Sequence, residues 1–180
     1  MNAQKFILLE AERFAARRHQ GQTRKDAART PYIEHPRALV HLLRETGGVC
    51  DVDVLAAGFL HDVLEDTDTT PKELQTAFGQ TITRIVMEVS DDKRLPKIAR
   101  KFLQVQGAPF ASREAKLVKL ADKICNLRDI LDSPPAGWTL TRKEDYFRWA
   151  KSVVDGLRGV NAALEDEFDR VYGRISELSS

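Results

Sequence analysis

The chain has 180 residues, of which 42% are hydrophobic and 31% charged, and its formal net charge is +1. This length allows one domain with a substantial core, and the balanced charge gives no long-range attraction to nucleic acid or a membrane surface. Cys50 and Cys125 lack metal-type spacing, which favours a reducing compartment. Because we find no signal peptide and no apolar run of about 18 residues, we expect a cytoplasmic protein without a nucleic-acid or membrane partner.

The first part of the chain predicts helices separated by polar connections. Apolar residues recur at spacings of three and four over residues 4–19, which predicts a first helix. A polar loop follows over residues 20–30, and Pro36 then suits the first position of a second helix. Asp51 or Asp53 can cap a third helix, which leads into a group of ionisable residues.

Capping residues and prolines mark the remaining helices. Thr70 and Pro71 form a helix start, and Gly79 is expected to end that helix. Later helix starts are marked by Pro96, Ser112, Thr141 and Asn161. Because no alternating strand, repeat or low-complexity segment is found, we expect an all-α fold. It would be a single compact multi-helix domain over residues 1–180, with a core over about 4–159 and a C-terminal helix over about 161–178.

Residues 59–68 hold the most unusual group of ionisable side chains. His61 and Asp62 end an apolar run, and Glu65 and Asp66 follow within about one and a half helical turns. Positions three and four apart share a face of a helix, so a continuous helix would gather these groups. Buried charges need partners, and a metal ion is one of few that can satisfy several carboxylates together. We therefore expect a metal site here, with Glu65 and Asp66 placed to orient a water molecule and accept its proton.

The other three histidines differ in their settings. His19 ends a charged helix beside Arg17 and Arg18, which favours a solvated surface position. His41 lies among leucines, which favours a core or boundary position over a ligand role. His35 stands at a helix start behind a basic loop, where side chains can converge on a pocket, so it is the better candidate for a second ligand.

Asp122 borders an apolar stripe rather than a charged face. By itself it is best explained as a surface carboxylate paired with Lys119 or Lys123. Taken with His61 and Asp62, it becomes the fourth member of a ligand set. That set is His35, His61, Asp62 and Asp122. Two imidazoles and two carboxylates suit manganese, iron or zinc with open positions for water and substrate, and such an ion activates water and polarises a phosphoryl oxygen.

A phosphate-ester substrate would also need cations. Arg24 and Lys25 lie in the loop before the second helix, close enough for that loop to fold over a pocket. A second basic patch is formed by Lys97, Arg100 and Lys101. Asn126 lies one helical turn beyond Asp122, so a substrate contact there would face the metal side. Tyr146 could stack on a base, although packing is the commoner fate of a tyrosine at helical spacing.

Several of these segments match a known family in order. They are residues 22–25, 30–36, 60–67, 116–123 with 126–128, and 137–138 with 144–147. On these motifs the chain resembles the HD-domain phosphohydrolases, and among them the RelA/SpoT alarmone hydrolases. It is most similar to the small stand-alone form, the metazoan SpoT homologue type.

The resemblance implies an all-helical domain with one bound manganese, whose ligands would be His35, His61, Asp62 and Asp122. Glu65 and Asp66 would handle the attacking water. The implied substrate contacts are Arg24, Lys25 and Asn126, with looser matches at Lys97, Arg142 and Tyr146. The implied reaction is hydrolysis of ppGpp or pppGpp, a small guanine nucleotide, to GDP or GTP and pyrophosphate.

Two positions depart from many bacterial bifunctional members of the family. Asp26 stands where they have a serine–glycine pair, and Asp129 where they usually have a threonine. No room remains for a synthetase domain, so we expect hydrolysis alone. Two alternatives stay open. One is a phosphatase that acts on the 2′-phosphate of NADPH or on another nucleotide. The other is a nucleotide sensor without turnover, and the Glu65–Asp66 pair argues against this second alternative. The oligomeric state, the physiological metal and the choice among substrates stay open too.

Overall fold

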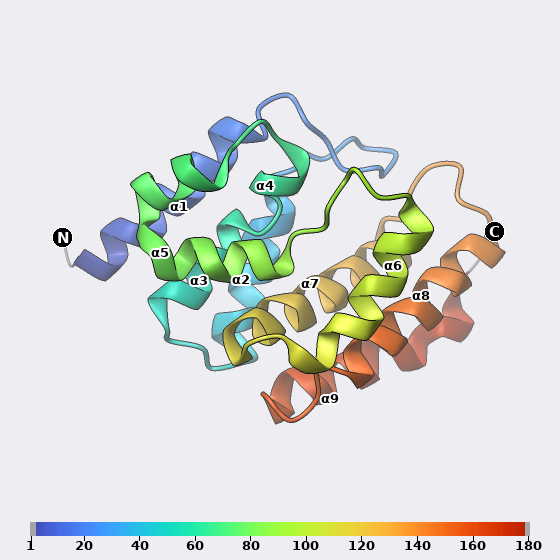
Figure 1. Ribbon diagram of the computed structural model, residues 1–180. Helices are drawn as coiled ribbons and strands as arrows, with labels where there is room; N and C mark the ends of the chain where they lie inside the picture. The colour runs from blue at the N-terminus through green and yellow to red at the C-terminus, as the bar shows by residue number, and fades with distance from the viewer. Residues whose placement is uncertain (1–2, 179–180) are drawn as a thin grey trace.

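The computed structural model describes residues 3–178, which form helices and no strand (Figure 1). The helices are α1 (Ala3–Arg18), α2 (Glu34–Glu45), α3 (Val52–Leu60), α4 (Val63–Asp66), α5 (Pro71–Val89), α6 (Lys97–Gly107), α7 (Arg113–Asp132), α8 (Leu140–Asp155) and α9 (Ala162–Gly173), with 3₁₀ turns η1 (Ala108–Phe110) and η2 (Arg174–Glu177). Thr23 and Pro31 make an isolated antiparallel bridge. The predicted all-α class is confirmed. Among the described residues, no helix has the length and apolar character that crossing a membrane would need.

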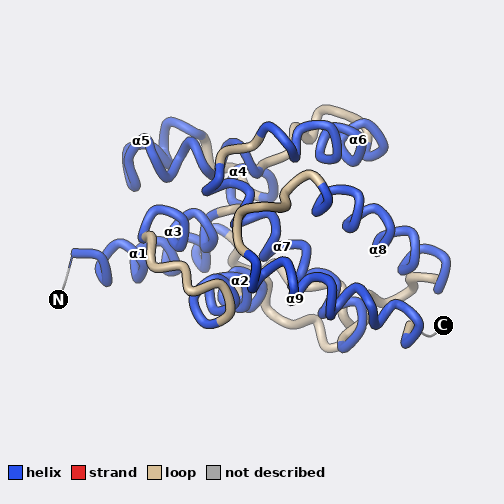
Figure 2. Tube along the Cα trace, turned by 90° about the horizontal axis from the view of Figure 1, so that it is seen from below, coloured by secondary structure: helices blue, strands red, loops and turns tan. Residues whose placement is uncertain are grey.

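Helix α7 runs through the centre of the molecule. Its apolar stripe is buried, and it packs against α2, α3, α5, α8 and α9. In both views α1, α3 and α5 lie towards one end and α6 and α8 towards the other (Figures 1 and 2). Because α7 borders both groups of helices, a polar residue on its middle turns can face side chains from α2 and α3 as well as α8.

Most of the predicted helix starts are confirmed, because the capping side chains accept backbone hydrogen bonds as expected. Ser112 accepts from the Ala115 N–H at 3.2 Å, and Asn161 accepts from the Leu164 N–H at 3.0 Å. The prediction for Thr141 is wrong: α8 begins at Leu140, and the cap is Thr139, whose hydroxyl accepts from the Arg142 N–H.

One further boundary differs from the sequence expectation, and one agrees with it. Helix α2 begins at Glu34, so Pro36 is its third residue rather than its first. Gly79 interrupts α5 as expected: its φ of 82° and ψ of 175° are non-helical, a conformation open to glycine at little cost, and a second helical segment follows to Val89. The kink lets both halves of α5 face the core, through Leu74 before it and Ile82 after it.

Candidate functional site

The segment with His61 and Asp62 is a turn between two helices. The expected continuous helix is wrong: α3 ends at Leu60, and Asp62 stands at the N-cap position of the short helix α4. The carbonyls of a last helical turn lack intrahelical partners, and the Gly58 carbonyl accepts a hydrogen bond from His61 Nδ1 at 2.8 Å. This bond orients the imidazole, so that its Nε2 faces the side chains described next.

A cluster of two histidines and two aspartates forms where α2, α3 and α7 meet. His61 Nε2 lies 2.9 Å from Asp62 Oδ2 and 3.9 Å from Asp122 Oδ1. His35 Nε2 lies 3.1 Å from Asp122 Oδ1. Ligand atoms of His35, His61 and Asp62 lie within 4.8 Å of one another. The structure therefore brings together all four predicted ligands.

The chemistry of this cluster fits a divalent cation. Because the Gly58 carbonyl can only accept, Nδ1 of His61 carries a proton, and Nε2 is the nitrogen that can give up its proton and bind a cation. That Nε2 is buried without a hydrogen-bond partner although a carboxylate oxygen is adjacent, which is the arrangement expected of nitrogen and oxygen ligands around one ion. His35, His61, Asp62 and Asp122 would hold the cation, which supplies Lewis-acid polarisation and water activation when bound.

Nearby charges shift the pKa values of the cluster, and these shifts bear on how it binds a cation. Burial lowers the pKa of His61, but Asp62 and Asp122 outweigh it and raise that pKa to about 9. A proton and a divalent cation thus compete for the same nitrogen, and metal binding releases protons. Burial raises the pKa of Asp122, yet the Lys123 ammonium at 3.0 Å and His35 bring it well below its usual range. The carboxylates are therefore ready to bind a cation at neutral pH.

Glu65 and Asp66 lie on α4, beside the cluster, in different surroundings. Asp66 pairs with Lys93, and its Oδ2 lies 3.4 Å from the Tyr32 hydroxyl, which also hydrogen-bonds Asp62. Burial is the main cause that raises the pKa of Glu65 to about 7, against a hydrogen bond from the Asp91 N–H. A carboxylate with such a pKa can accept a proton near neutral pH.

We expect Glu65 to make folding stability depend on pH in protein stripped of metal with EDTA. Its folded pKa of about 7 lies above the ordinary value of 4.5, so the folded state favours the protonated form. The contribution is fully present below pH 4.5 and is lost as pH rises through about 7. Urea unfolding of wild type and Glu65→Gln across this range should show wild type losing stability relative to the variant. A difference that stays constant with pH would contradict the expectation.

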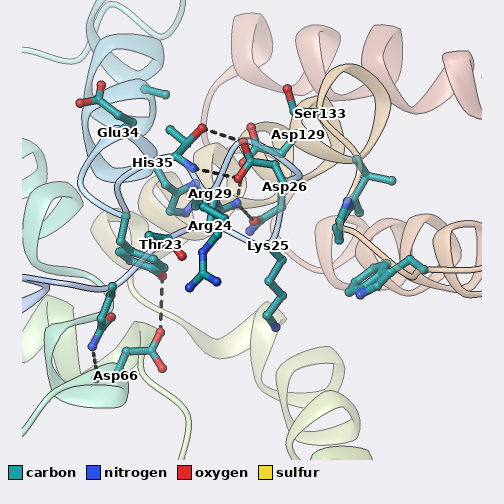
Figure 3. A pocket seen from close by; sticks show the side chains of 18 of the residues that line it. Thr23, Arg24, Lys25, Asp26, Arg29, Glu34, His35, Asp66, Asp129 and Ser133 are labelled. Atoms are coloured by element: carbon teal, nitrogen blue, oxygen red, sulfur yellow. Dashed lines mark hydrogen bonds and ion pairs between the residues drawn. The ribbon is translucent and has the colours of Figure 1, made fainter.

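A cavity of about 910 Å³ adjoins the cluster, within the size range of nucleotide and cofactor sites. Arg24, Lys25, Asn126 and Tyr146 line it, together with His35 and Asp66 (Figure 3). Arg24 and His35 also line the smaller cavity of about 210 Å³ around the histidine–aspartate cluster. A substrate bound in the large cavity would therefore reach the cluster directly.

The loop before α2 places Arg24 in this cavity. The Arg24 N–H donates to the Thr30 carbonyl at 2.8 Å, and the Asp26 carboxylate accepts from the Thr30 N–H at 3.0 Å, so the loop closes on itself. The Arg24 guanidinium pairs with Asp129 and donates to Asn126 Oδ1 at 3.0 Å. Asp26 and Asp129, the two departures from the bacterial pattern, thus shape and hold the Arg24 loop.

Two of the predicted substrate residues lie outside the lining of both cavities. Lys97 is exposed at the start of α6, and Arg142 is exposed over the Trp138 ring, 4.3 Å from its centroid. Burial and then the nearby cations Arg142 and Lys25 lower the pKa of Lys97, so these three positive charges lie close together. Lys97 and Arg142 thus form a cationic edge together with Lys25, which also lines the large cavity.

The surface assignment of His19 is wrong. The side chain is buried, its Nδ1 lies 2.9 Å from Gln22 Oε1, and its ring stacks on Tyr32. His41 is exposed rather than at the core or its boundary, because it faces away from the apolar side of α2. Sequence reasoning also missed Tyr32, which contacts Asp62, and Lys93, which contacts Asp66. For Tyr32 one signal was available, its position three residues before His35.

Comparisons with known proteins agree on the relationship of this chain. A family model described as HD domain matches residues 11–147. Relatives from Xenopus tropicalis and Homo sapiens, named guanosine-3′,5′-bis(diphosphate) 3′-pyrophosphohydrolase MESH1, are each 49% identical over 172 residues, which are 96% of this chain and 96% of theirs. A solved structure described as a metazoan ortholog of SpoT that hydrolyzes ppGpp matches with a TM-score of 0.92 and 43% identity, over 99% of this chain and 98% of that one.

The helical fold and the buried histidine–aspartate cluster define a metal-dependent phosphohydrolase of the HD type. The chain belongs to the HD-domain family, and within it to the small stand-alone alarmone hydrolases. The predicted family is thereby confirmed.

Proposed function

We propose that this chain hydrolyses guanosine tetraphosphate, ppGpp, to GDP and pyrophosphate, and pppGpp to GTP and pyrophosphate. One observation carries the proposal: the two-histidine, two-aspartate cluster opens into a nucleotide-sized cavity whose wall carries Arg24, Lys25 and Asn126. The names of relatives that match over nearly the whole chain support the choice of nucleotide.

In the proposed reaction, water attacks the phosphorus bonded to the ribose 3′ oxygen. A new P–O bond forms between the water oxygen and that phosphorus, and the P–O3′ bond breaks. The departing 3′ oxygen takes up a proton, which balances the proton that the water loses, so the products are pyrophosphate and a nucleotide with a free 3′-hydroxyl. Glu65 accepts a proton from the water, and Asp66, held by Lys93 and next to the Tyr32 hydroxyl, orients that water. The Arg24 guanidinium and the Asn126 amide contact the nucleotide, so that binding exchanges the Arg24–Asp129 ion pair for contacts with the nucleotide.

The further substrate roles follow from position. Lys25, Lys97 and Arg142 form the cationic edge, which would face the phosphates that extend from the cavity. Tyr146 lies between Trp138 and Trp149, with ring centroids at 5.8 and 5.2 Å, and would offer its edge to a base or ribose. We propose manganese as the bound ion, because two imidazoles and two carboxylates form a mixed nitrogen and oxygen set that suits a hard or borderline transition metal.

The test is turnover by purified protein loaded with manganese, iron or zinc. We expect pyrophosphate release from ppGpp with manganese, and a kcat/KM for ppGpp above that for NADPH measured side by side. Phosphate release from NADPH with the higher kcat/KM would reassign the substrate. If calorimetry showed tight ppGpp binding while the assay detected no product, the chain would instead be assigned as a nucleotide sensor.

A further inference from the structure

Helix α6 is an unusual element because none of its residues is buried. It packs against α8 and the turn η1. Trp149 Nε1 donates to the Lys101 carbonyl at 3.1 Å on that side. On its other side α6 meets the catalytic region through polar side chains, and those contacts suggest a role beyond packing.

Arg100 of α6 reaches the acid that we propose as the proton acceptor. Its Nη1 lies 3.3 Å from Glu65 Oε1 and 3.6 Å from Asp91 Oδ2. The side chains of Arg100 and Glu65 are only 22% and 18% exposed, so water screens this pair weakly. The other oxygen of Glu65 accepts from the Asp91 N–H at 3.2 Å. Both carboxylate oxygens are thus held by the segment from Asp91 to Arg100.

A third residue, Gln104, links Asp91 to α6. Gln104 lies one turn beyond Arg100, and its Nε2 donates to both oxygens of Asp91 at 2.9 and 2.8 Å. Gln104 also lines the cavity around the histidine–aspartate cluster. Asp91 therefore joins Glu65, Arg100 and Gln104 into one network, and a shift of α6 would move the Glu65 carboxylate.

We infer that Arg100 is a positioning residue for the reaction: from α6 it fixes the orientation of the Glu65 carboxylate. This inference rests on the proposed function, because it assigns Glu65 as proton acceptor. Arg100 acts through Glu65 and is not itself required to touch the substrate.

Charged groups on several elements face Glu65. They are Asp62 and Asp66 beside it, Asp91 and Lys93 from the connection after α5, Arg100 from α6 and Lys119 from α7. Lys93 Nζ stands at 4.0 Å from Glu65 Oε1, whereas its closer partner is Asp66. Among these cations, Arg100 makes the nearest ion pair with Glu65.

The experiment compares Arg100→Gln, Arg100→Lys and the matched control Arg94→Gln. Arg94 lies in the same segment, is 90% exposed and pairs with Asp92. For Arg100→Gln we expect kcat on ppGpp to fall by about 10- to 100-fold with KM changed less than about threefold, because misplacement of a catalytic group costs rate rather than binding. Arg100→Lys should recover much of the loss, and Arg94→Gln should behave as wild type.

A second readout does not depend on turnover. Carbon-13 relaxation NMR of side-chain-labelled glutamate in metal-free protein, with Glu65→Gln to assign the signal, reports how well ordered the Glu65 side chain is. We expect this order to fall in Arg100→Gln, because one of the two carboxylate oxygens loses its partner. Arg94→Gln should leave the order of the Glu65 side chain unchanged.

The outcomes separate the possible roles. A raised KM with unchanged kcat would make Arg100 a phosphate contact and overturn the inference. Equal losses in Arg100→Gln and Arg100→Lys, in step with a lowered melting temperature, would make it merely structural and overturn it as well. If wild type fails to turn over ppGpp, the proposed function fails by itself, and an unchanged order of the Glu65 side chain in Arg100→Gln is then the result that rejects the role of Arg100.

Discussion

Replacing Asp122 by asparagine is expected to lower metal affinity by more than about 100-fold, because changes outside the ligand shell already cost 10- to 100-fold. Asp122 Oδ1 lies near both histidines, at 3.1 Å from His35 Nε2 and 3.9 Å from His61 Nε2. Asparagine keeps the shape of the side chain but removes the negative charge. At limiting manganese, turnover should fall in proportion to the metal lost.

The folded state must be checked in the same experiment. Lys123 is buried and pairs with Asp122 at 3.0 Å, so the variant leaves a buried ammonium without its carboxylate. Its stacking over the Trp149 ring, 4.6 Å from the centroid, retains part of that stabilisation. The melting temperature of the metal-free variant separates this cost from the loss of a ligand.

Asp132→Asn is the matched control, because Asp132 ends the same helix, is 61% exposed and pairs with Arg174. It should leave metal content and turnover as in wild type. Elemental analysis after dialysis against limiting manganese gives the direct measurement. An Asp122→Asn protein that stays folded and retains one ion per chain would contradict the role of Asp122 as a ligand.

The helical architecture could be predicted because local rules govern it. Capping by Ser112 and Asn161 depends on residues three positions away, and the buried stripe of α7 repeats with helical spacing. The break between α3 and α4 escaped the same rules. A continuous helix and a turn carry the same spacing of apolar residues, so this spacing did not show that α3 would end at Leu60, with His61 bonded to the Gly58 carbonyl.

The candidate metal ligands could be predicted from the sequence more completely than the residues that contact the acids of the site. Acids beside an apolar run need compensation wherever they fold, so Asp62 and Asp122 stood out in the sequence. By contrast, Tyr32, Lys93 and Arg100 contact the acids from distant parts of the chain. A cation or a tyrosine on a polar segment has the same sequence signature whether it is solvated or holds a carboxylate. The buried position of His19 was missed for the same reason, since its partner Tyr32 lies on the loop that folds back over it.

Replacing Glu65 by glutamine is expected to lower kcat on ppGpp by about two to four orders of magnitude, the usual cost of losing a general base. Glutamine keeps the size and the hydrogen bond from the Asp91 N–H, but it cannot take a proton. Glu65 is not among the four proposed ligands, so metal content should remain that of wild type. KM should change little, because Glu65 does not line the large cavity.

The pH profile makes this prediction specific to proton transfer. In wild type, kcat should rise with pH on an acidic limb, because only the carboxylate form of Glu65 accepts a proton. A bound cation favours that carboxylate form, so the midpoint of the limb should lie at or below the Glu65 pKa of about 7. In Glu65→Gln the limb should disappear and the residual rate should be flat across it. Glu10→Gln, on the surface of α1 beside Arg13, is the matched control and should retain the limb. If Glu65→Gln kept both the rate and the limb of wild type, another group would have to accept the proton, and Asp66 would be the next to replace.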